Sequence, residues 1–241
     1  KRAKKEYNCC CGKKYNFQSS LCYHKKKCDY KENNEEEIKL EEDNINYKEL
    51  VMKLLIDNQE IKNQHNEIVL LKGQKGLLKW LEVQPNVSNI GCAVAIGGHR
   101  GRERVALLET MKSLGLTLLT ITHPSAFVSC NAIIEEGCQI LANSSVCVDV
   151  KLGTGCIINT SASVDHDCVL GNGVHIGPGA NLAGEITVGD GSFVGAGATV
   201  LPGLNIGADV IIGAGAVVVR DVEAGALMVG NPAKKLIKRS N

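Results

Sequence analysis

Aliphatic residues recur at every sixth position through the second half of the chain. From Val128 to Val218, sixteen consecutive positions taken in steps of six hold only Val, Ile or Leu. This period matches neither the strand repeat of about 2 nor the helix repeat of about 3.6, and it is typical of a coil of stacked identical units. We therefore predict a parallel β-helix in which three hexads close one triangular coil, so that the repeat makes about five coils.

Small residues accompany this pattern. Glycine follows the aliphatic position in seven of the hexads, and the fifth position holds small residues such as Ala162, Ala180 and Ala198. We expect the glycines to lie at corners, where they accept backbone angles that a Cβ would penalise. Aromatic residues make up 4% of the chain, which fits a narrow interior filled by aliphatic side chains. No loop interrupts the register of the repeat.

One histidine of the repeat has the surroundings of a general base. His166 lies between Asp165 and Asp167, in the third position of its hexad, which is near a corner and therefore exposed. A carboxylate can orient one imidazole nitrogen and raise the basicity of the other, as proton transfer requires. The alternative is an ordinary surface histidine with charged neighbours, on a coil whose role is purely structural.

Several segments of the repeat resemble one family of enzymes. The runs 158–171, 175–180, 182–184 and 229–233 are similar to the sugar O- and N-acyltransferases related to sialic acid O-acetyltransferases and UDP-4-amino-sugar N-acetyltransferases. The resemblance covers residues 90–240. It implies a left-handed β-helix, although crossover connections are usually right-handed. It also implies a homotrimer that binds acetyl-CoA between neighbouring β-helices.

The same resemblance implies roles for individual residues. His166 would be the proton acceptor, and Asp167 would be the acidic residue that makes it more basic. Asn159 would hold this acidic partner or the substrate, and the backbone N–H of Gly184 would stabilise the oxyanion. The implied reaction is a direct transfer, in which an acceptor amine attacks the thioester of acetyl-CoA while His166 removes its proton.

Four further residues are implied to contact the two substrates. His175 matches a residue that contacts acetyl-CoA, and Ala196 and Ala214 match positions whose backbone lines the channel for it. Gly97 matches a glycine that contacts the acceptor substrate. Because a general base serves an amine and a hydroxyl equally, N-acetylation of an amino sugar and O-acetylation of a sugar such as sialic acid both stay open.

A partial α/β unit precedes the repeat. The spacing of apolar residues predicts a strand over 92–96, a helix over 102–114 and a second strand over 117–122. The family's first β-α unit, with its glycine-rich phosphate loop, is absent, which leaves a truncated substrate-binding unit. Arg100 and Arg102, at the start of the helix, would either meet a diphosphate or simply be solvated.

The preceding segment is rich in Asn, Glu, Lys and Ile. An acidic run over 32–43 is expected to be solvated, and a helical pattern follows from Tyr47 to Leu71. We interpret this helix as a spacer. A short coiled coil that feeds an oligomer is the alternative.

The first 28 residues carry five of the eleven cysteines and nine basic residues against one acidic residue. Cys9, Cys11, His24 and Cys28 have the spacing of a small zinc finger, with Cys10 as an alternative ligand. The segment resembles the finger-plus-coil N-termini common in giant-virus proteins. We predict a structural zinc ion. The finger would contact nucleic acid or another protein, or it would simply add stability.

The remaining six cysteines lie scattered in apolar surroundings. This pattern fits free, buried thiols in a reducing compartment. The sequence shows no signal peptide and no apolar run long enough to span a membrane. We therefore expect a cytoplasmic protein.

Together these patterns predict four segments. They are a zinc-finger-like segment over 1–30, an acidic linker and helix over 31–76, a truncated α/β unit over 77–124 and a β-helix acyltransferase domain over 125–241. The predicted function is acetyl-CoA-dependent acetylation of a nucleotide-linked amino sugar. An alternative of a different class is a zinc-finger binding module fused to a non-catalytic β-helix. The His166–Asp167 pair disfavours that alternative, whereas the missing glycine-rich loop favours it.

Overall fold

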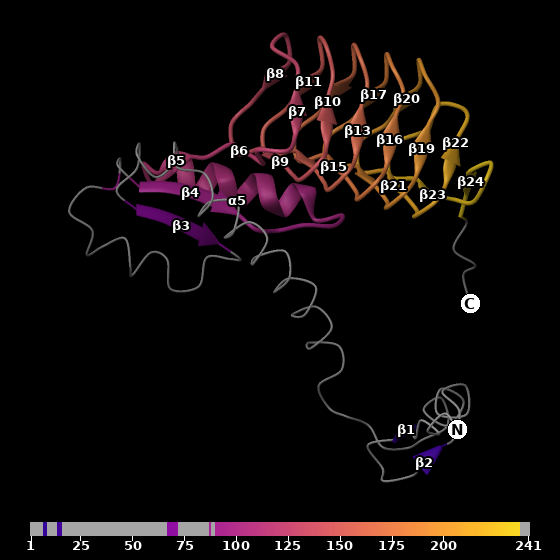
Figure 1. Ribbon diagram of the computed structural model, residues 1–241, viewed down its shortest axis with the longest axis horizontal. Helices are drawn as coiled ribbons and strands as arrows, with labels where there is room; N and C mark the ends of the chain where they lie inside the picture. Colours follow the sequence, from indigo (N-terminus) through magenta and orange to yellow (C-terminus); the bar gives the residue numbers. More distant parts are fainter. Residues whose placement is uncertain (1–6, 9–13, 16–66, 72–86, 88–89, 237–241) are drawn as a thin grey trace, which may run out of the picture. The chain divides into compact units, whose positions relative to one another are not determined.

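A computed structural model describes residues 7–8, 14–15, 67–71, 87 and 90–236 (Figure 1). The chain divides into two compact units, 1–43 and 44–241. In the first unit, strand β1 (Tyr7–Asn8) pairs antiparallel with strand β2 (Lys14–Tyr15). The predicted zinc ligands, the acidic run and the predicted helix up to residue 66 lie outside the described residues.

Most of the second unit is a left-handed parallel β-helix of very short strands, which fall into three sheets, one for each side of the coil. The first sheet contains β6 (Ile121–Thr122), β9 (Gln139–Ile140), β12 (Ile157–Ile158), β15 (His175–Ile176), β18 (Phe193–Val194), β21 (Ile211–Ile212), β23 (Leu227–Val229) and the antiparallel β24 (Lys234–Lys235). The second contains β7 (Phe127–Val128), β10 (Ser145–Val146), β13 (Ser163–Val164), β16 (Asn181–Leu182), β19 (Thr199–Val200) and β22 (Val217–Val218). The third contains β8 (Ile133–Ile134), β11 (Lys151–Leu152), β14 (Val169–Leu170), β17 (Thr187–Val188) and β20 (Asn205–Ile206).

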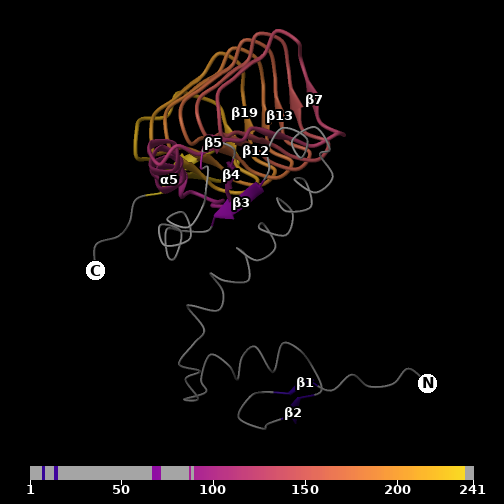
Figure 2. The ribbon, with the colours of Figure 1, turned by 90° about the vertical axis from the view of Figure 1, so that its left-hand side faces the viewer.

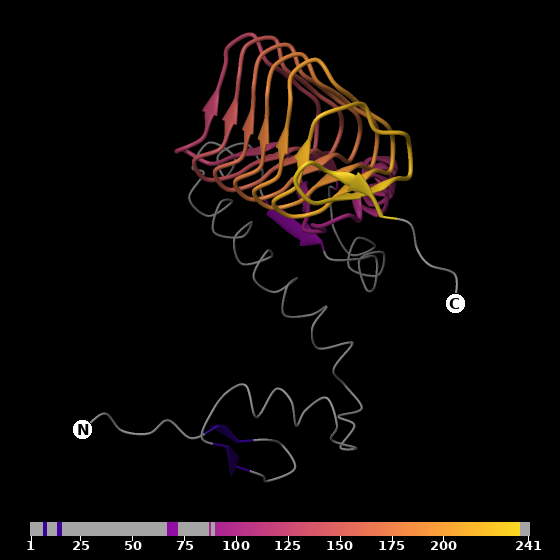
Figure 3. The same ribbon diagram turned by 90° about the vertical axis from the view of Figure 1, so that its right-hand side faces the viewer.

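The aliphatic position of each hexad points into the coil, as predicted. Each strand pairs with the equivalent strand of the next coil, so Val146 lies beside Val164 and Val164 beside Leu182. Every aliphatic position from Ile140 to Val218 is at most 2% exposed. These side chains form one continuous core inside the coils. Figures 2 and 3 show the backbone of the stacked coils from opposite sides.

The β-helix extends further at both ends than the repeat predicts. Residues 121–122 and 227–229 form strands β6 and β23 of the first sheet. The seven parallel strands of that sheet define six turns, one more than predicted. The six-residue pattern does not predict these two end strands, because the sequence departs from the pattern at each end. Thr122 places a polar residue at the aliphatic position, and Met228 pairs with Ile212 after sixteen residues instead of eighteen.

The glycines that follow the aliphatic positions have a different role from the one predicted. A Cβ at Gly189 would lie 2.4 Å from the backbone nitrogen of Ala208, and one at Gly177 would lie 2.6 Å from the carbonyl oxygen of Val194. These glycines are therefore required because the next coil stacks against their Cα atoms. The left-handed backbone angles occur two residues later, for example at Gly155 with a φ of 68° and at Asp167 with a φ of 59°.

A small α/β layer packs on the first sheet of the β-helix (Figure 1). Its three parallel strands lie in the order β3 (Glu67–Leu71), β4 (Ile90–Val94), β5 (Thr117–Leu118), and helix α5 (Gly101–Ser113) connects β4 to β5. The structure thus confirms the predicted strand–helix–strand order. Leu108 and Met111, on the predicted apolar face of the helix, are fully buried.

Two predictions about this layer are wrong. Residues 67–71, assigned to the end of a helix, form strand β3 alongside β4, and their consecutive apolar residues are typical of a strand in a parallel sheet. The strand predicted over 117–122 is divided into β5, which pairs with β4, and β6, which pairs with β9 of the β-helix. The layer therefore has one more strand than predicted, and the chain passes directly from it into the coil.

Helix α5 lies along one corner of the β-helix, where glycines leave room for it. A Cβ at Gly155 would lie 2.6 Å from Leu108, and one at Gly173 would lie 2.7 Å from the carbonyl oxygen of Gly101. Gly155 and Gly173 are equivalent positions of successive coils. Glycine at this corner therefore allows the helix to approach the coil more closely than any side chain would permit.

Among the described residues, no helix is long and apolar enough to cross a membrane. The cysteines of the second unit are free, and Cys92, Cys138, Cys156 and Cys168 are buried as predicted. Cys147 is half-buried and Cys130 is exposed, so the prediction of buried thiols does not hold for all six.

Candidate functional site

His166 lies at the corner where the chain leaves strand β13 of the second sheet and enters β14 of the third. Its side chain is 48% exposed. The imidazole Nδ1 lies 2.9 Å from Oδ2 of Asp167, and the backbone N–H of His166 donates to Oδ1 of Asp165 at 2.8 Å. The histidine–aspartate pair predicted from the sequence is therefore in hydrogen-bond contact at an exposed corner.

The electrostatic surroundings make His166 more basic. The hydrogen bond to Asp167 raises the pKa of His166, desolvation opposes this increase, and the negative charges of Asp165, Asp167 and Glu185 add to it. Because an ionised carboxylate can only accept, Nδ1 carries the proton and Nε2 keeps its lone pair. No described residue forms a hydrogen bond with Nε2, so this nitrogen can take a proton from a substrate.

Gly184 occupies the same corner one coil further along. A Cβ at this position would lie 2.5 Å from both Cε1 and Nε2 of His166. The ring of His166 therefore rests directly on the Gly184 backbone. Within the described part of the chain, the Gly184 N–H meets no acceptor, which leaves it available as a donor next to the ring of His166.

Asn159 forms a hydrogen bond with His175 and not with the acidic partner, while its alternative expected role, contact with the substrate, stays a prediction. Its Nδ2 lies 3.1 Å from Nε2 of His175, and its Oδ1 accepts from the backbone N–H of Thr160 at 2.7 Å. It follows strand β12 of the first sheet, whereas His166 and Asp167 follow β13 of the second. The structure thus pairs Asn159 with His175, and no hydrogen bond to Asp167 is formed.

His175 is 4% exposed and lies between the β-helix and the α/β layer. Its Nδ1 lies 3.1 Å from the carbonyl oxygen of Gly98, and its ring packs edge-on against Phe193 with the centroids 5.1 Å apart. Burial, together with the positive charge of Arg104, lowers the pKa of His175 to about 3. The ring is therefore neutral, with both nitrogens engaged, and its predicted contact with acetyl-CoA stays a prediction.

Ala196 and Ala214 are exposed and lie one coil apart at the corner between the first and second sheets. A Cβ at Gly195 would lie 2.6 Å from the backbone nitrogen of Ala214, so the two coils are in close backbone contact there. His166 occupies the next corner, between the second and third sheets. A single chain therefore places the predicted acetyl-CoA positions and the predicted base at different corners.

Gly97 follows strand β4 at the edge of the α/β layer and is half-buried. Arg100 forms an ion pair with Glu103 on the same helix. Arg102 donates to both carboxylate oxygens of Asp209, at 2.8 and 3.0 Å. Both arginines are thus exposed and paired with carboxylates, which favours the solvated alternative over a diphosphate contact.

Arg104 is a buried cation that the sequence analysis did not single out. It is 0% exposed and donates to the carbonyl oxygens of Ile96, Gly155 and Gly173 at 2.6–2.7 Å. A buried charge requires such compensation. Arg104 therefore joins the end of strand β4 to two successive coils of the β-helix.

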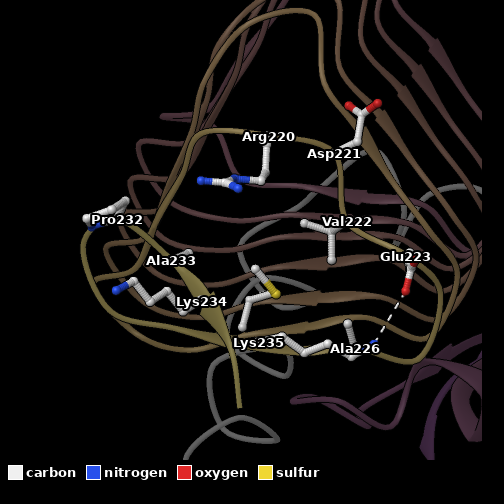
Figure 4. Close-up of a pocket in the computed structure, with 10 residues that line it drawn as sticks. Arg220, Asp221, Val222, Glu223, Ala226, Pro232, Ala233, Lys234 and Lys235 are labelled. Carbon is white, nitrogen blue, oxygen red and sulfur yellow. Dashed lines mark hydrogen bonds and ion pairs between the residues drawn. The ribbon is translucent and has the colours of Figure 1, made fainter. Parts of the chain in front are cut away.

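A cavity of about 460 Å³ opens at the last turn of the β-helix (Figure 4). It is lined by the apolar residues Val222, Ala226, Met228, Pro232 and Ala233 and by the charged residues Arg220, Asp221, Glu223, Lys234 and Lys235. Lys235 forms an ion pair with Glu223 at 3.4 Å. The cavity contains neither His166 nor its carboxylate partners, so it is separate from the candidate catalytic corner.

No metal site is present in the described part of the second unit or in the two short strands of the first, since no cluster of three suitable His, Cys, Asp or Glu side chains occurs there. The predicted zinc ligands Cys9, Cys11, His24 and Cys28 lie outside the described residues. The zinc site accordingly stays a prediction.

Comparison of the sequence with family models identifies a family of transferases. The family of bacterial transferase hexapeptide repeats, described as six repeats, matches residues 167–202 and 185–220. Comparison with curated proteins gave no match.

Several solved structures are similar to this chain. The acetyltransferase domain of PglB from Neisseria gonorrhoeae, in complex with acetyl coenzyme A, is 39% identical with a TM-score of 0.63, over 66% of this chain and 76% of that chain. A histidine-to-alanine variant of GDP-perosamine N-acetyltransferase from Caulobacter crescentus, in complex with CoA and GDP-perosamine, is 40% identical with a TM-score of 0.64, over 69% and 77%. WeeI from Acinetobacter baumannii is 25% identical with a TM-score of 0.65, over 78% and 92%.

Proposed function

The chain belongs to the family of hexapeptide-repeat transferases and is an acyltransferase, and from this premise we propose that it transfers the acetyl group of acetyl-CoA to the amine of a nucleotide-linked sugar. The observation that carries the proposal is the His166–Asp167 hydrogen bond with its free Nε2. Similarity to enzymes solved with acetyl-CoA, or with CoA and GDP-perosamine, supports both substrates.

The proposed reaction is direct transfer without a covalent enzyme intermediate. The acceptor nitrogen bonds to the thioester carbonyl carbon while Nε2 of His166 takes its proton. The carbon–sulfur bond then breaks, and CoA leaves as the thiol with a proton returned by His166. The Gly184 N–H, which lies beside the ring, is the proposed donor to the oxyanion, a contribution of about 3 kcal/mol at comparable sites.

We propose that the active site forms between two copies of the chain in a homotrimer. The separation of His166 from Ala196 and Ala214 by one corner supports this, because a neighbouring β-helix can bring the two corners together. Apolar side chains exposed at the His166 corner, Val148 at 42% and Leu201 at 41%, also favour a covering partner. A ring of three copies closes by rotational symmetry.

The acceptor site is proposed to lie at the Gly97–Gly98 turn. This turn follows a strand at the carboxyl edge of a parallel sheet, where α/β folds bind their ligands. The contact between Gly98 and His175 holds it against the β-helix. The ion pairs of Arg100 and Arg102 do not support direct phosphate binding by either side chain.

The test is release of CoA thiol from acetyl-CoA in the presence of a panel of UDP- and GDP-linked amino sugars, with the matching hydroxy sugars as competitors for the O-acetylation alternative. We expect turnover with an amino sugar and a loss of about 10²–10⁴-fold in His166→Ala. The variant should keep the assembly state of the wild type in analytical ultracentrifugation. A His166→Ala protein with near-full rate, or a wild type silent with every acceptor, would overturn the proposal.

A further inference from the structure

Three buried side chains hold alternate carbonyl groups at the end of strand β4. Nε2 of Gln139 donates to Val94 at 2.9 Å, Arg104 donates to Ile96 at 2.7 Å, and Nδ1 of His175 donates to Gly98 at 3.1 Å. The three donors are between 0 and 4% exposed. This row follows the backbone from the sheet of the α/β layer to the turn that contains Gly97.

These polar side chains occupy positions where apolar ones suffice elsewhere. Gln139, Ile157 and His175 stand side by side on neighbouring strands of the first sheet and point toward the α/β layer. Ile157, between the other two, is apolar and 0% exposed. Burying a polar side chain is unfavourable unless a hydrogen bond compensates it. The polar residues are thus found where a backbone carbonyl of the layer faces the coil.

His175 extends this row toward the predicted acetyl-CoA corner. Because the amide nitrogen of Asn159 can only donate, Nε2 of His175 accepts and its Nδ1–H donates to Gly98. Asn159 in turn accepts from the backbone N–H of Thr160, at the corner that carries Ala196 two coils further along. One neutral imidazole therefore links the Gly97–Gly98 turn to the turn that follows strand β12.

We propose that His175, supported by Arg104 and Gln139, is a positioning residue that sets the place of the acceptor turn relative to the acetyl-CoA corner. This inference rests on the proposed function for the identity of the two substrates. It differs from the role implied by family resemblance, in which His175 contacts acetyl-CoA directly. The two roles predict different kinetic effects, since a positioning residue acts on the acceptor.

The kinetic test compares His175→Leu with His175→Asn in the full chain. Leucine removes both hydrogen bonds, whereas the asparagine amide places a donor near the position of Nδ1. We expect His175→Leu to raise the KM for the amino-sugar nucleotide about tenfold, as for the loss of about one hydrogen bond, with the KM for acetyl-CoA within about twofold of wild type. His175→Asn should recover most of the acceptor KM. The control is Lys112→Gln, which breaks a surface ion pair between helix α5 and Glu136. It should leave both KM values unchanged.

Two measurements test the positioning role without catalysis. Nitrogen NMR of the wild type should show His175 as the neutral tautomer protonated at Nδ1. Hydrogen exchange over residues 97–100 should be faster in His175→Leu than in wild type and Lys112→Gln. A selective rise in the KM for acetyl-CoA, or unchanged exchange in His175→Leu, would overturn the inference. If no acceptor is acetylated, the proposed function fails while the exchange result still decides whether His175 holds the turn.

Discussion

The imidazole of His166 rests on the Cα of Gly184, where a Cβ would lie 2.5 Å from the ring nitrogen Nε2. Gly184→Ala should therefore force the ring away from its position, since the ring is the end of an exposed side chain and can move. We expect kcat to fall about 10²-fold, the lower range of what a general base contributes. The melting temperature should stay within a few degrees of wild type, because the coil itself need not shift.

Pro202→Ala is a matched control for this change. Residue 202 occupies the same corner one coil beyond Gly184 and is exposed. The Pro202→Ala variant should retain at least half of the wild-type rate, as measured by the release of CoA thiol. Full activity in Gly184→Ala would show that the ring position seen here is not needed for catalysis.

The hydrogen bond between His166 and Asp167 predicts a shift in the pH profile. The pKa of His166 is raised chiefly by this bond, and a general base must be neutral to act. The rate of the wild type should thus fall as pH decreases through a pKa above the ordinary histidine value of about 6.5. In Asp167→Asn the pKa falls, so the acidic limb of kcat/KM should move to lower pH while the plateau rate decreases.

Glu185→Gln provides the comparison for Asp167→Asn. Glu185 raises the pKa of His166 through its charge alone, and its effect is the smallest of those that act on this pKa. The acidic limb should therefore move in the same direction but by much less. An acidic limb at the same pH in wild type and Asp167→Asn would mean that another group controls the profile.

The fold was predictable where the sequence repeats and unpredictable where tertiary pairing decides. An inward aliphatic residue at every sixth position is enforced by stacking, so the coil from Val128 to Val218 follows from the period. The outer strands β6 and β23 depart from the period and are held by pairing with β9 and β21. Strand β3 is likewise defined by its pairing with β4, which a helical pattern over 47–71 does not reveal.

The candidate site divides in the same way. His166 and Asp167 are adjacent in the chain, so the sequence alone brings them together. The contacts of His175 with Gly98 and Asn159 join segments 77 and 16 residues apart, and no local pattern encodes them. Arg104 did leave a signal, because it lies four and seven residues before Leu108 and Met111, on the face of the helix that the apolar spacing marks as buried.

Arg104 should contribute more to stability than any exposed ion pair of its helix. In Arg104→Met, the carbonyl groups of Ile96, Gly155 and Gly173 lose their buried donor. We expect the free energy of unfolding in urea to fall by about 3 kcal/mol. Arg104→Lys should also be destabilising, because an ammonium group lacks the planar fork that reaches several carbonyls.

Arg102→Gln is the control for Arg104, two residues away on the same helix. Its ion pair with Asp209 is exposed, with side chains 57% and 52% accessible. Such pairs contribute about 0–1 kcal/mol. An equal decrease in the free energy of unfolding in Arg102→Gln and Arg104→Met would contradict the central role of the buried arginine.

The buried, neutral His175 predicts how stability depends on pH. Burial and the charge of Arg104 lower its pKa to about 3 in the folded chain, whereas the unfolded chain has the ordinary value of about 6.5. The unfolded state therefore binds more protons between these values, so the stabilisation present above about pH 6.5 is lost as pH decreases. His175→Asn lacks this titration. The stability of wild type minus that of His175→Asn should thus decrease by about 2 kcal/mol between pH 7 and pH 5.

Urea unfolding of both proteins at one fixed chain concentration measures this difference, because association shifts apparent stability. His166 and the exposed carboxylates titrate equally in both proteins and cancel. A difference that stays constant from pH 7 to pH 5 would show that the ring of His175 titrates as it does in water, and that it is not enclosed between Gly98 and Asn159.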